Sequence, residues 1–475
     1  MKNTRKTKII ATLGPSCSTP KTIEEMMLSG VDVFRINFSH ADHSEIKKII
    51  STIRSLNKKN NYFTSILADL QGPKLRIGNV DEDVNIIKDD ILEFCSEKKF
   101  TGNNKRVYVK YKKFAKDVKI GEKLLIDDGK LIFEILETDN ESNVKARVIQ
   151  GGPLFSKKGI NLPNTKISLP ALTEKDFEDA VFSINQKVDW IALSFVRNGN
   201  DLNELKKIIQ EKSKHKIPII SKIEKPEALE NIDQIISNSD GIMVARGDLG
   251  VEVSAAKVPL IQKQLVNKSK KARIPVIIAT QMMEGMIKSL TPTRAEVNDV
   301  ANSVMDGADA VMLSGETSVG KYPIKVVSEM SSILKTVENS PLIKVPQSPP
   351  SVRSKRYITK SICYHAANMA NEIDATAICT LTNSGYTAFQ ISAWRPKANI
   401  LVFTSNELIL SQLNLLWGVK AFYYDKFEST DKTVEQVNSI ALKNNFVNKG
   451  DMLINLAAMP VKKKGMVNTL RISMI

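Results

Sequence analysis

Long apolar runs are missing from this sequence of 475 residues, and none approaches the ~20 consecutive apolar residues that a membrane span needs. The first residues, MKNTRKTKIIATLG, lead directly into a strand-like run and lack the apolar core of a signal peptide. Cysteine is scarce as well, since Cys17, Cys95, Cys363 and Cys379 are scattered without paired spacing. Such spacing is typical of a reducing compartment, so we expect a cytoplasmic protein with no membrane partner.

Histidine and aromatic residues are also few. His40 and His43 lie three residues apart without cysteine or histidine partners, which argues against a metal site built on histidine. The formal charge of +16 raises the possibility of nucleic-acid binding, but aromatics make up only 6% of the chain and no stacking platform stands out. The lysines are spread through helix-like segments such as EIKKII, which favours a solvated basic surface and no nucleic-acid partner.

The chain is rich in short apolar runs that alternate with amphipathic stretches. It is too long for a single hydrophobic core, so we expect several domains. Many amphipathic stretches open at helix-start signals, for example at Ser18-Thr19-Pro20 and Thr173. This alternation predicts an α/β fold built on a (β/α)8 TIM barrel. The runs assigned to its strands are residues 8–12, 31–37, 64–69, 188–194, 217–223, 241–245, 275–279 and 310–313.

The alternation is interrupted once, between the third and fourth strands. Residues 71–168 contain strand-like segments separated by turn pairs such as Asp128-Gly129, which predicts a small all-β domain inserted into a barrel made of residues 1–70 and 169–339. A proline-rich linker, SPLIKVPQSPPSV, follows the barrel. Residues 353–475 alternate again, and we predict a C-terminal three-layer α/β domain there.

The stretch 217–253 carries the strongest chemical signal. Lys222 and Glu224 follow one apolar run, and Arg246 and Asp248 follow the next. Functional groups collect at the carboxyl ends of parallel strands, and two carboxylates there suit Mg2+ or Mn2+. The adjacent cations suit a phosphorylated or enolic substrate, and the backbone amide of Gly247 can approach a ligand closely. Each pair taken alone is equally compatible with a solvated ion pair.

The second strand ends in a similar group. Arg35, Asn37 and Ser39 alternate along the chain, so a strand directs them to one face. A capped strand end explains the same pattern without any function.

Several stretches resemble the pyruvate kinase family: SKIE followed by SDGIMVARGDLG, together with FRINFSH, ADLQGPKLRIG, KKGINLP and ATQMMEGM. The resemblance extends over essentially the full length and is densest over residues 8–76 and 157–322. It implies that the chain transfers the phosphoryl group of phosphoenolpyruvate to ADP, giving pyruvate and ATP in the last step of glycolysis. Phosphoryl transfer mainly requires positioning and electrostatic stabilisation from the protein.

By this resemblance, Glu224 and Asp248 hold Mg2+ or Mn2+. Arg35, Arg76 and Lys222 then neutralise charge on the transferred group, with Lys222 also stabilising the enolate.

The resemblance also implies a substrate pocket at other strand ends. Gly247 and Asp248 belong to it, and Thr280 lies beside the substrate carbon that accepts a proton. Ser194 and Ser314 follow apolar strand residues, as barrel-facing groups do. Taken in isolation, such hydroxyls are more often structural.

A nucleotide site is implied by Asn37, His40, Arg76 and Lys158. In the family, the lysine of KKGINLP reaches toward the phosphoryl group when the inserted domain closes, and closure excludes water that would hydrolyse the activated phosphate. Without the resemblance, Lys158 belongs to a basic turn.

The region that holds a monovalent cation in the family is represented by Asn37, Ser39, Asp69 and Leu70. Potassium-dependent members carry glutamate where this chain has Lys74. A fixed ammonium can take the place of K+ without a binding equilibrium, so we predict that K+ is not required.

In the C-terminal domain, one loop resembles the site of a sugar-phosphate effector in regulated family members, and a homotetramer is implied in the same way. The loop residues are Thr382, Asn383, Ser384, Gly385 and Thr387. Two other readings of the sequence stay open. A pyruvate aldolase also uses a metal and an enolate on a barrel, and a nucleic-acid-binding role rests on charge alone.

Overall fold

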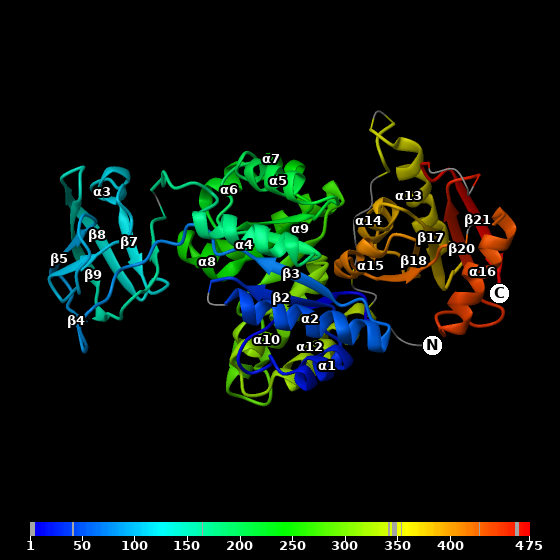
Figure 1. Ribbon diagram of the computed structural model, residues 1–475, viewed down its shortest axis with the longest axis horizontal. Coiled ribbons are helices and arrows are strands. Elements are labelled where there is room, and N and C mark those ends of the chain that lie inside the picture. Colours follow the sequence, from blue (N-terminus) through cyan, green and yellow to red (C-terminus); the bar gives the residue numbers. More distant parts are fainter. Residues whose placement is uncertain are drawn as a thin grey trace.

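The structure is a computed structural model that describes residues 5–39, 42–163, 165–340, 343, 349–352, 354–426, 428–460 and 465–475. Three parts lie in a row, with the inserted β domain at one end, a barrel in the middle and an α/β domain at the other end (Figure 1). Within the described residues, no helix is both long enough and apolar enough to cross a membrane.

The middle part is a closed barrel of parallel strands in the order β1-β16-β15-β14-β13-β12-β3-β2. This confirms the predicted TIM barrel, although several strands begin one or two residues later than predicted. The strands are β1 (Lys8–Thr12), β2 (Val33–Asn37), β3 (Ser65–Asp69), β12 (Trp190–Leu193), β13 (Ile219–Ile223), β14 (Gly241–Ala245), β15 (Val276–Ala279) and β16 (Ala310–Leu313).

Helices surround the barrel, and several begin at the predicted signals. Thr19 caps one helix that has proline in its first turn, and Thr173 opens another with a capping box completed by Asp176. The main helices are α1 (Pro20–Ser29), α2 (His43–Asn60), α4 (Glu174–Asn185), α5 (Asp201–Lys212), α6 (Pro226–Glu230), α7 (Ile232–Asn238), α9 (Val258–Ala272), α10 (Arg294–Asp306) and α12 (Pro323–Glu338).

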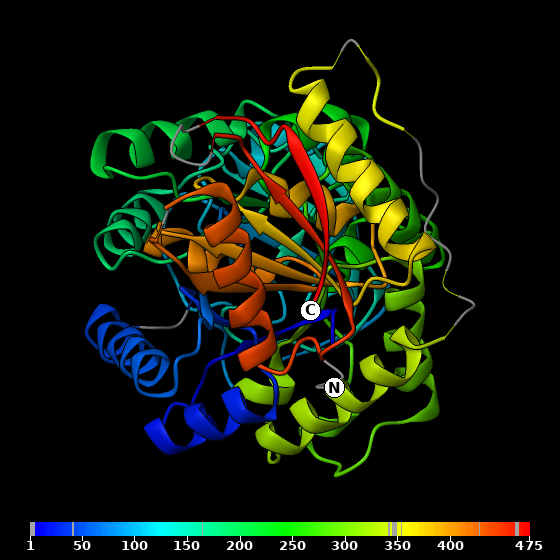
Figure 2. The same ribbon diagram turned by 90° about the vertical axis from the view of Figure 1, so that its right-hand side faces the viewer.

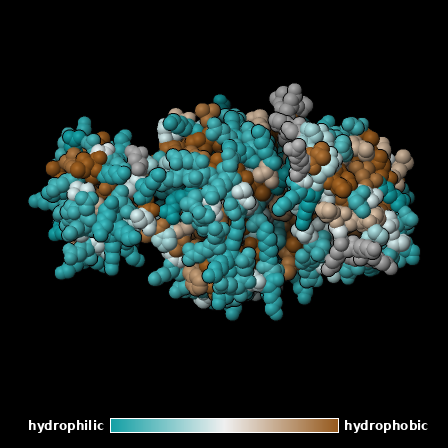
Figure 3. Space-filling view, turned by 90° about the horizontal axis from the view of Figure 1, so that it is seen from above, coloured by the Kyte–Doolittle hydropathy of each residue, from teal (hydrophilic) through white to brown (hydrophobic). Residues whose placement is uncertain are grey.

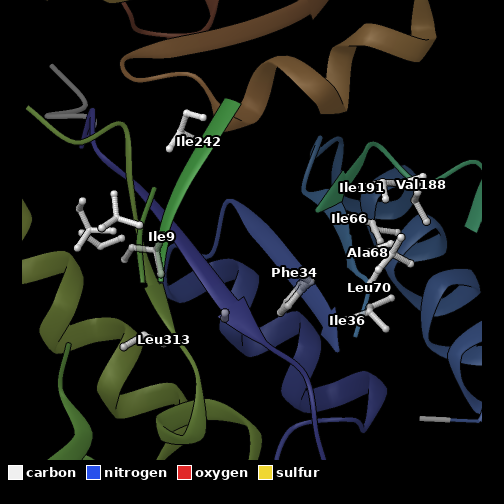
Figure 4. Packing of buried hydrophobic residues seen from close by; sticks show 14 of the residues in the cluster. Ile9, Phe34, Ile36, Ile66, Ala68, Leu70, Val188, Ile191, Ile242 and Leu313 are labelled. Carbon is white, nitrogen blue, oxygen red and sulfur yellow. The ribbon is translucent and has the colours of Figure 1, made fainter. Parts of the chain in front are cut away.

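Alternation along each strand separates two cores. Ile9 on β1 packs outward with Phe34 and Ile36 in the layer between strands and helices (Figure 4), whereas its neighbour Ile10 packs inside the barrel with Trp190. Period-two packing of this kind holds every strand in register, so the strand ends that carry functional groups are fixed relative to one another.

The inserted part contains a six-stranded sheet in the order β11-β7-β8-β9-β5-β6 and a two-stranded sheet β10-β4. Its own hydrophobic core includes Phe94, Phe114 and Phe133. The elements are β4 (Asn85–Ile86), β5 (Ile91–Cys95), β6 (Arg106–Tyr108), α3 (Phe114–Asp117), β7 (Lys123–Ile126), β8 (Leu131–Thr138), β9 (Asn143–Gln150), β10 (Gly152–Pro153) and β11 (Ile160–Asn161).

The C-terminal part has a five-stranded sheet in the order β19-β18-β17-β20-β21 (Figure 2). A hydrophobic cluster packs on each face of this sheet. Its last strand runs antiparallel and was not predicted, because its residues are mostly half-buried or exposed. The elements are α13 (Tyr357–Glu372), β17 (Ala377–Leu381), α14 (Tyr386–Ala393), β18 (Asn399–Thr404), α15 (Glu407–Gln412), β19 (Val419–Tyr423), α16 (Thr430–Lys443), β20 (Met452–Ala457) and β21 (Thr469–Met474).

The C-terminal part covers the amino-terminal end of the barrel. Trp190 donates its indole N–H to the Gln412 carbonyl at 3.1 Å, and Lys8 donates from Nζ to the Val419 carbonyl at 2.9 Å. The surface seen from above is largely hydrophilic over the barrel and the inserted part (Figure 3). The opposite, carboxyl end of the barrel faces the inserted part and is left for chemistry.

Candidate active site

Glu224 and Asp248 lie at the same end of the barrel on neighbouring strands. Strands β13 and β14 are parallel and pair Lys222 with Met243 and Ile223 with Val244. Glu224 directly follows β13, and Asp248 lies in the first turn of the short helix α8 (Arg246–Glu252), which begins where β14 ends. The sequence predicted that both carboxylates follow strand ends. In the structure, β14 ends at Ala245 and α8 begins at the next residue, so Asp248 lies in a helix.

Lys222 is the centre of a buried polar cluster. Its Nζ lies 3.1 Å from Glu224 Oε1 and 3.2 Å from Asp69 Oδ1, and it donates a hydrogen bond to Ser194 Oγ at 2.8 Å. Burial disfavours the ammonium form, but Asp69 and Glu224 outweigh burial and raise the pKa of Lys222 above its usual value. Lys222 therefore stays charged at neutral pH.

Asp69 joins this lysine to Arg35. Arg35 Nε donates to Asp69 Oδ2 at 2.6 Å, and Arg35 Nη1 donates to Thr12 Oγ1 at 3.0 Å. Burial favours the neutral acid, but Lys222 and Arg35 hold the pKa of Asp69 below its usual value. The carboxylate thus fixes two cations that point toward the same end of the barrel.

Glu224 is almost fully buried, and its Oε2 accepts a hydrogen bond from the backbone N–H of Phe195 at 2.6 Å. Burial, followed by repulsion from Asp248 and Asp69, raises the pKa of Glu224 although Lys222 opposes the shift. A bound cation would favour the ionised form of Glu224, which burial and the neighbouring carboxylates disfavour. Asp248 already contacts one cation, since Lys74 Nζ lies 3.0 Å from Asp248 Oδ1.

The donor set fits a hard divalent ion that keeps other ligands. Among the described residues no group of three or more His, Cys, Asp or Glu side chains is arranged to hold a metal. Two carboxylates with remaining positions for water and substrate oxygens are typical of Mg2+, which seldom occupies an all-protein cage.

Thr280 lies beside the start of α8. Its hydroxyl accepts from the Gly247 N–H at 2.7 Å and donates to the Ala279 carbonyl at 2.6 Å, and its backbone has φ of 70°. A Cβ at Gly247 would come within 3.3 Å of Thr280 Oγ1, so glycine permits this close approach. Arg246 Nη1 donates to Asp299 Oδ1 at 2.7 Å, and its Nη2 donates to the Thr280 carbonyl at 2.7 Å.

The remaining predicted barrel residues occupy nearby strand ends. Ser194 Oγ donates to the Leu70 carbonyl at 2.7 Å, and Asn37 Oδ1 accepts from the Ser39 N–H at 3.2 Å. Ser314 follows β16, and its buried hydroxyl has no hydrogen-bond partner within the described residues.

The predicted nucleotide-binding residues are not all brought to this cluster. Arg76 Nη1 donates to the Lys157 carbonyl at 3.1 Å, and Lys158 Nζ forms an ion pair with Asp127 of the inserted part at 2.8 Å. Both cations are therefore engaged within the inserted part and its junction. His40 lies outside the described residues.

The predicted effector loop lies between β17 and α14 in the C-terminal part. Thr382 Oγ1 accepts from the Gly385 N–H at 3.0 Å, Thr387 Oγ lies 3.0 Å from the hydroxyl of Thr380, and the Asn383 carbonyl accepts from Asn406 at 3.1 Å. Ser384 lines a cavity of about 310 Å³ next to this loop.

Sequence reasoning missed three residues at the junction with the inserted part: Asn161, Lys225 and Glu252. Glu252 accepts from Asn161 at 2.9 Å and from Lys225 at 2.6 Å. The signal in the sequence was the spacing, because Glu252 stands four residues after Asp248 and Lys225 directly follows Glu224.

Comparison with known proteins identifies the family. The model of the pyruvate kinase barrel domain matches residues 4–327, and that of the pyruvate kinase alpha/beta domain matches residues 360–473. This chain belongs to the pyruvate kinase family. It is 40% identical to the pyruvate kinase of Corynebacterium glutamicum over 471 residues, covering 99% of this chain and 98% of that protein.

Other pyruvate kinases are similarly close. The enzyme of Geobacillus stearothermophilus is 39% identical over 472 residues, which are 99% of this chain and 80% of that protein. The crystal structure of a pyruvate kinase from Cryptosporidium parvum superposes with a TM-score of 0.91 at 33% identity, covering 99% of this chain and 96% of that one. The chain is a phosphotransferase that carries the phosphoryl group of phosphoenolpyruvate to ADP, as the sequence predicted.

Proposed function

We propose that the cluster around Lys222 carries out pyruvate kinase chemistry. The observation that supports this most strongly is the buried group of Lys222, Glu224, Asp69 and Arg35, in which two cations are held charged at one end of the barrel. Phosphoryl transfer spreads negative charge over the moving group, and fixed cations in a dry site stabilise it without reorganisation.

Arg35 and Lys222 contact the phosphoryl group in this proposal, and Asp69 orients both of them. Arg76 and Lys158 add positive charge on the ADP side when the inserted part approaches the barrel, with Asn37 and His40 near the nucleotide. Lys158 must exchange Asp127 for the phosphate, which the surface position of this ion pair allows, since 35% of the Lys158 side chain is exposed.

Glu224 and Asp248 would hold Mg2+ or Mn2+. When bound, the ion neutralises charge on the carboxylate and phosphate of phosphoenolpyruvate. Gly247, Ser194 and Ser314 lie at the same end of the barrel and line the substrate pocket in this proposal, with the Gly247 N–H held by Thr280 Oγ1.

Lys222 then stabilises the enolate that phosphoryl transfer leaves behind. Thr280 directly follows β15 and contacts Gly247 at the start of α8, and its hydroxyl with water relays a proton to the substrate carbon. The contacts of Thr280 with Gly247 and Ala279 support this by holding the hydroxyl in one orientation.

Lys74 supplies the charge that K+ supplies in other members. Its Nζ lies 3.0 Å from Asp248 Oδ1. By the family resemblance, Asn37, Ser39, Asp69 and Leu70 complete the cation region. We therefore propose turnover without added potassium.

The further proposals rest on the family. They are a cytoplasmic homotetramer and a phosphorylated effector bound at the loop containing Thr382 and Ser384. Chromatography with light scattering tests the assembly, and a panel of phosphosugars and AMP tests the effector.

The deciding experiment is a coupled assay for pyruvate formed from phosphoenolpyruvate. We expect pyruvate to appear only with both ADP and Mg2+, and to appear equally in sodium and potassium buffers. Pyruvate released from a hydroxy-keto acid without ADP would instead identify an aldolase, and dependence on KCl would contradict the role of Lys74.

A further inference from the structure

A buried polar cluster joins the inserted part to both strands that precede the proposed metal ligands. We call Asn161, Lys225 and Glu252 the hinge cluster. Asn161 Nδ2 donates to Glu252 Oε1 at 2.9 Å, and Lys225 Nζ lies 2.6 Å from the same oxygen. The three residues are 3%, 8% and 4% exposed, so these contacts are shielded from water.

The hinge cluster is directly continuous with the metal ligands. Lys225 follows Glu224 in the chain, and Glu252 ends the helix α8 one turn after Asp248. One carboxylate oxygen therefore links the segment of Glu224 to the helix of Asp248.

The third member belongs to the other side of the junction. Asn161 ends β11, which pairs with β7 in the sheet of the inserted part through Asn161 and Leu125. A rotation of the inserted part would therefore move Asn161 with that sheet and alter its hydrogen bond to Glu252.

The hinge cluster lies beside a small cavity at the junction. The cavity of about 30 Å³ is lined by Lys74, Asn161, Arg197, Lys225 and Glu252 together with apolar residues of both sides. The hydrogen bond from Asn161 to Glu252 is therefore a directional contact between the two parts beside space that side chains do not fill.

We propose that the hinge cluster positions Glu224 and Asp248 for the divalent ion according to the orientation of the inserted part. Asn161, Lys225 and Glu252 are positioning residues in this scheme, and none touches the substrate. The inference rests on the proposed metal-holding role of Glu224 and Asp248.

The test uses the full-length protein with two substitutions of Asn161. Asn161→Ala removes the hydrogen bond, and Asn161→Asp keeps the shape but places a second carboxylate against Glu252. Asn104→Ala is the matched control, because Asn104 is an exposed asparagine of the inserted part. Two quantities are measured: Mn2+ affinity without substrates, from the electron paramagnetic resonance signal of the free ion, and kcat with saturating Mg2+.

We expect Asn161→Asp to weaken Mn2+ binding at least threefold and to lower kcat about tenfold, because the new carboxylate repels Glu252 and the hydrogen-bond donor is lost. Asn161→Ala has a smaller effect in the same direction. The KM for phosphoenolpyruvate stays within about twofold of wild type, and Asn104→Ala matches wild type in every measurement.

Mn2+ affinity within twofold of wild type in both Asn161 variants would overturn the proposal, even if Tm or kcat falls, because that result describes a structural contact only. Glu224→Ala separates this failure from failure of the metal site itself. If Glu224→Ala also binds Mn2+ normally, the proposed ligands are wrong. If it loses Mn2+ while the Asn161 variants keep it, only the hinge inference is wrong.

Discussion

The two ends of the barrel each bury a lysine, and the contrast between them shows what an active site requires. Lys222 lies one residue before the carboxyl end of its strand β13, with Asp69 and Glu224 at 3.2 and 3.1 Å. Lys8 begins β1 at the opposite end, and its nearest carboxylate, Asp32, lies 3.7 Å away. Asp32 is already paired with Arg5 at 2.5 Å.

The two lysines differ in pKa because they differ in the carboxylates around them. Lys8 is fully buried and the Lys222 side chain is 11% exposed, and burial alone lowers the pKa of a lysine. For Lys8, burial dominates over Asp32 and lowers the pKa to about 7. For Lys222, burial is outweighed by Asp69 and Glu224, and the pKa rises. A buried lysine thus serves as a permanent cation only where the fold supplies it with carboxylates of its own.

The largest effect is expected from removing the charge at the catalytic end. Lys222→Met should lower kcat by about 1,000-fold or more, which corresponds to roughly 4 kcal/mol of transition-state stabilisation. Steady-state kinetics of pyruvate formation measure it. Lys207→Met is the control, because Lys207 is a solvent-exposed lysine on α5. Near-normal turnover of the Lys222 variant would contradict the assignment.

A second change makes the catalytic lysine more like Lys8. Asp69→Asn removes the stronger of the two counter-charges of Lys222, so the pKa of Lys222 should fall. A lysine with a lowered pKa loses its proton as pH rises, so kcat should decline toward alkaline pH in the variant and stay flat in wild type. We expect a loss of about 100-fold at neutral pH, since one charged hydrogen-bond partner of Arg35 is also lost. Parallel pH profiles in the two proteins would refute this account.

A smaller and more specific effect on activity is expected from replacing Lys74, the cation beside Asp248. Lys74→Glu replaces an ammonium with the acidic residue of potassium-dependent family members. We expect the variant to be stimulated about tenfold by KCl over NaCl, whereas wild type responds to neither salt. Lys74→Met is the companion variant, and it should be slower than wild type without regaining activity in KCl.

The smallest effect concerns Lys8 and appears in stability. The pKa of Lys8 is about 7 in the folded protein and near the ordinary lysine value of 10.5 in the unfolded chain, so between these values the unfolded chain binds one more proton. Stability therefore rises with pH across this window. In Lys8→Met this contribution is gone, and Tm should rise less between pH 7 and 10 than in wild type. Calorimetry measures the difference, and equal slopes would show that Lys8 remains charged.

Most barrel strands were predictable because short buried runs alternate with capped helices. The strand β14 was predicted to the residue, since Gly241 begins and Ala245 ends an uninterrupted apolar run. β21 was missed because its pairing with β20, and not its own pattern, makes it a strand. Helix α8 was missed because RGDLGVE contains two glycines that weaken any helical signal.

In the candidate site, too, some residues were predictable from the sequence, whereas their side-chain partners were not. Resemblance pointed to Lys222, Glu224 and Asp248 as residues of one family motif. The turn of Arg246 toward Asp299, and the engagement of Lys158 by Asp127, depend on residues more than 30 positions away in the chain, and no local pattern encodes such partners.

By itself the sequence determined the strand and helix alternation, the inserted part and the acidic and basic residues at strand ends, because these follow from apolar periodicity and local capping. Only the tertiary structure decided which of those charges meet. Burial depth and the distance between groups from separate strands set the charge state of Lys222 and Lys8, and both quantities exist only once the barrel has closed.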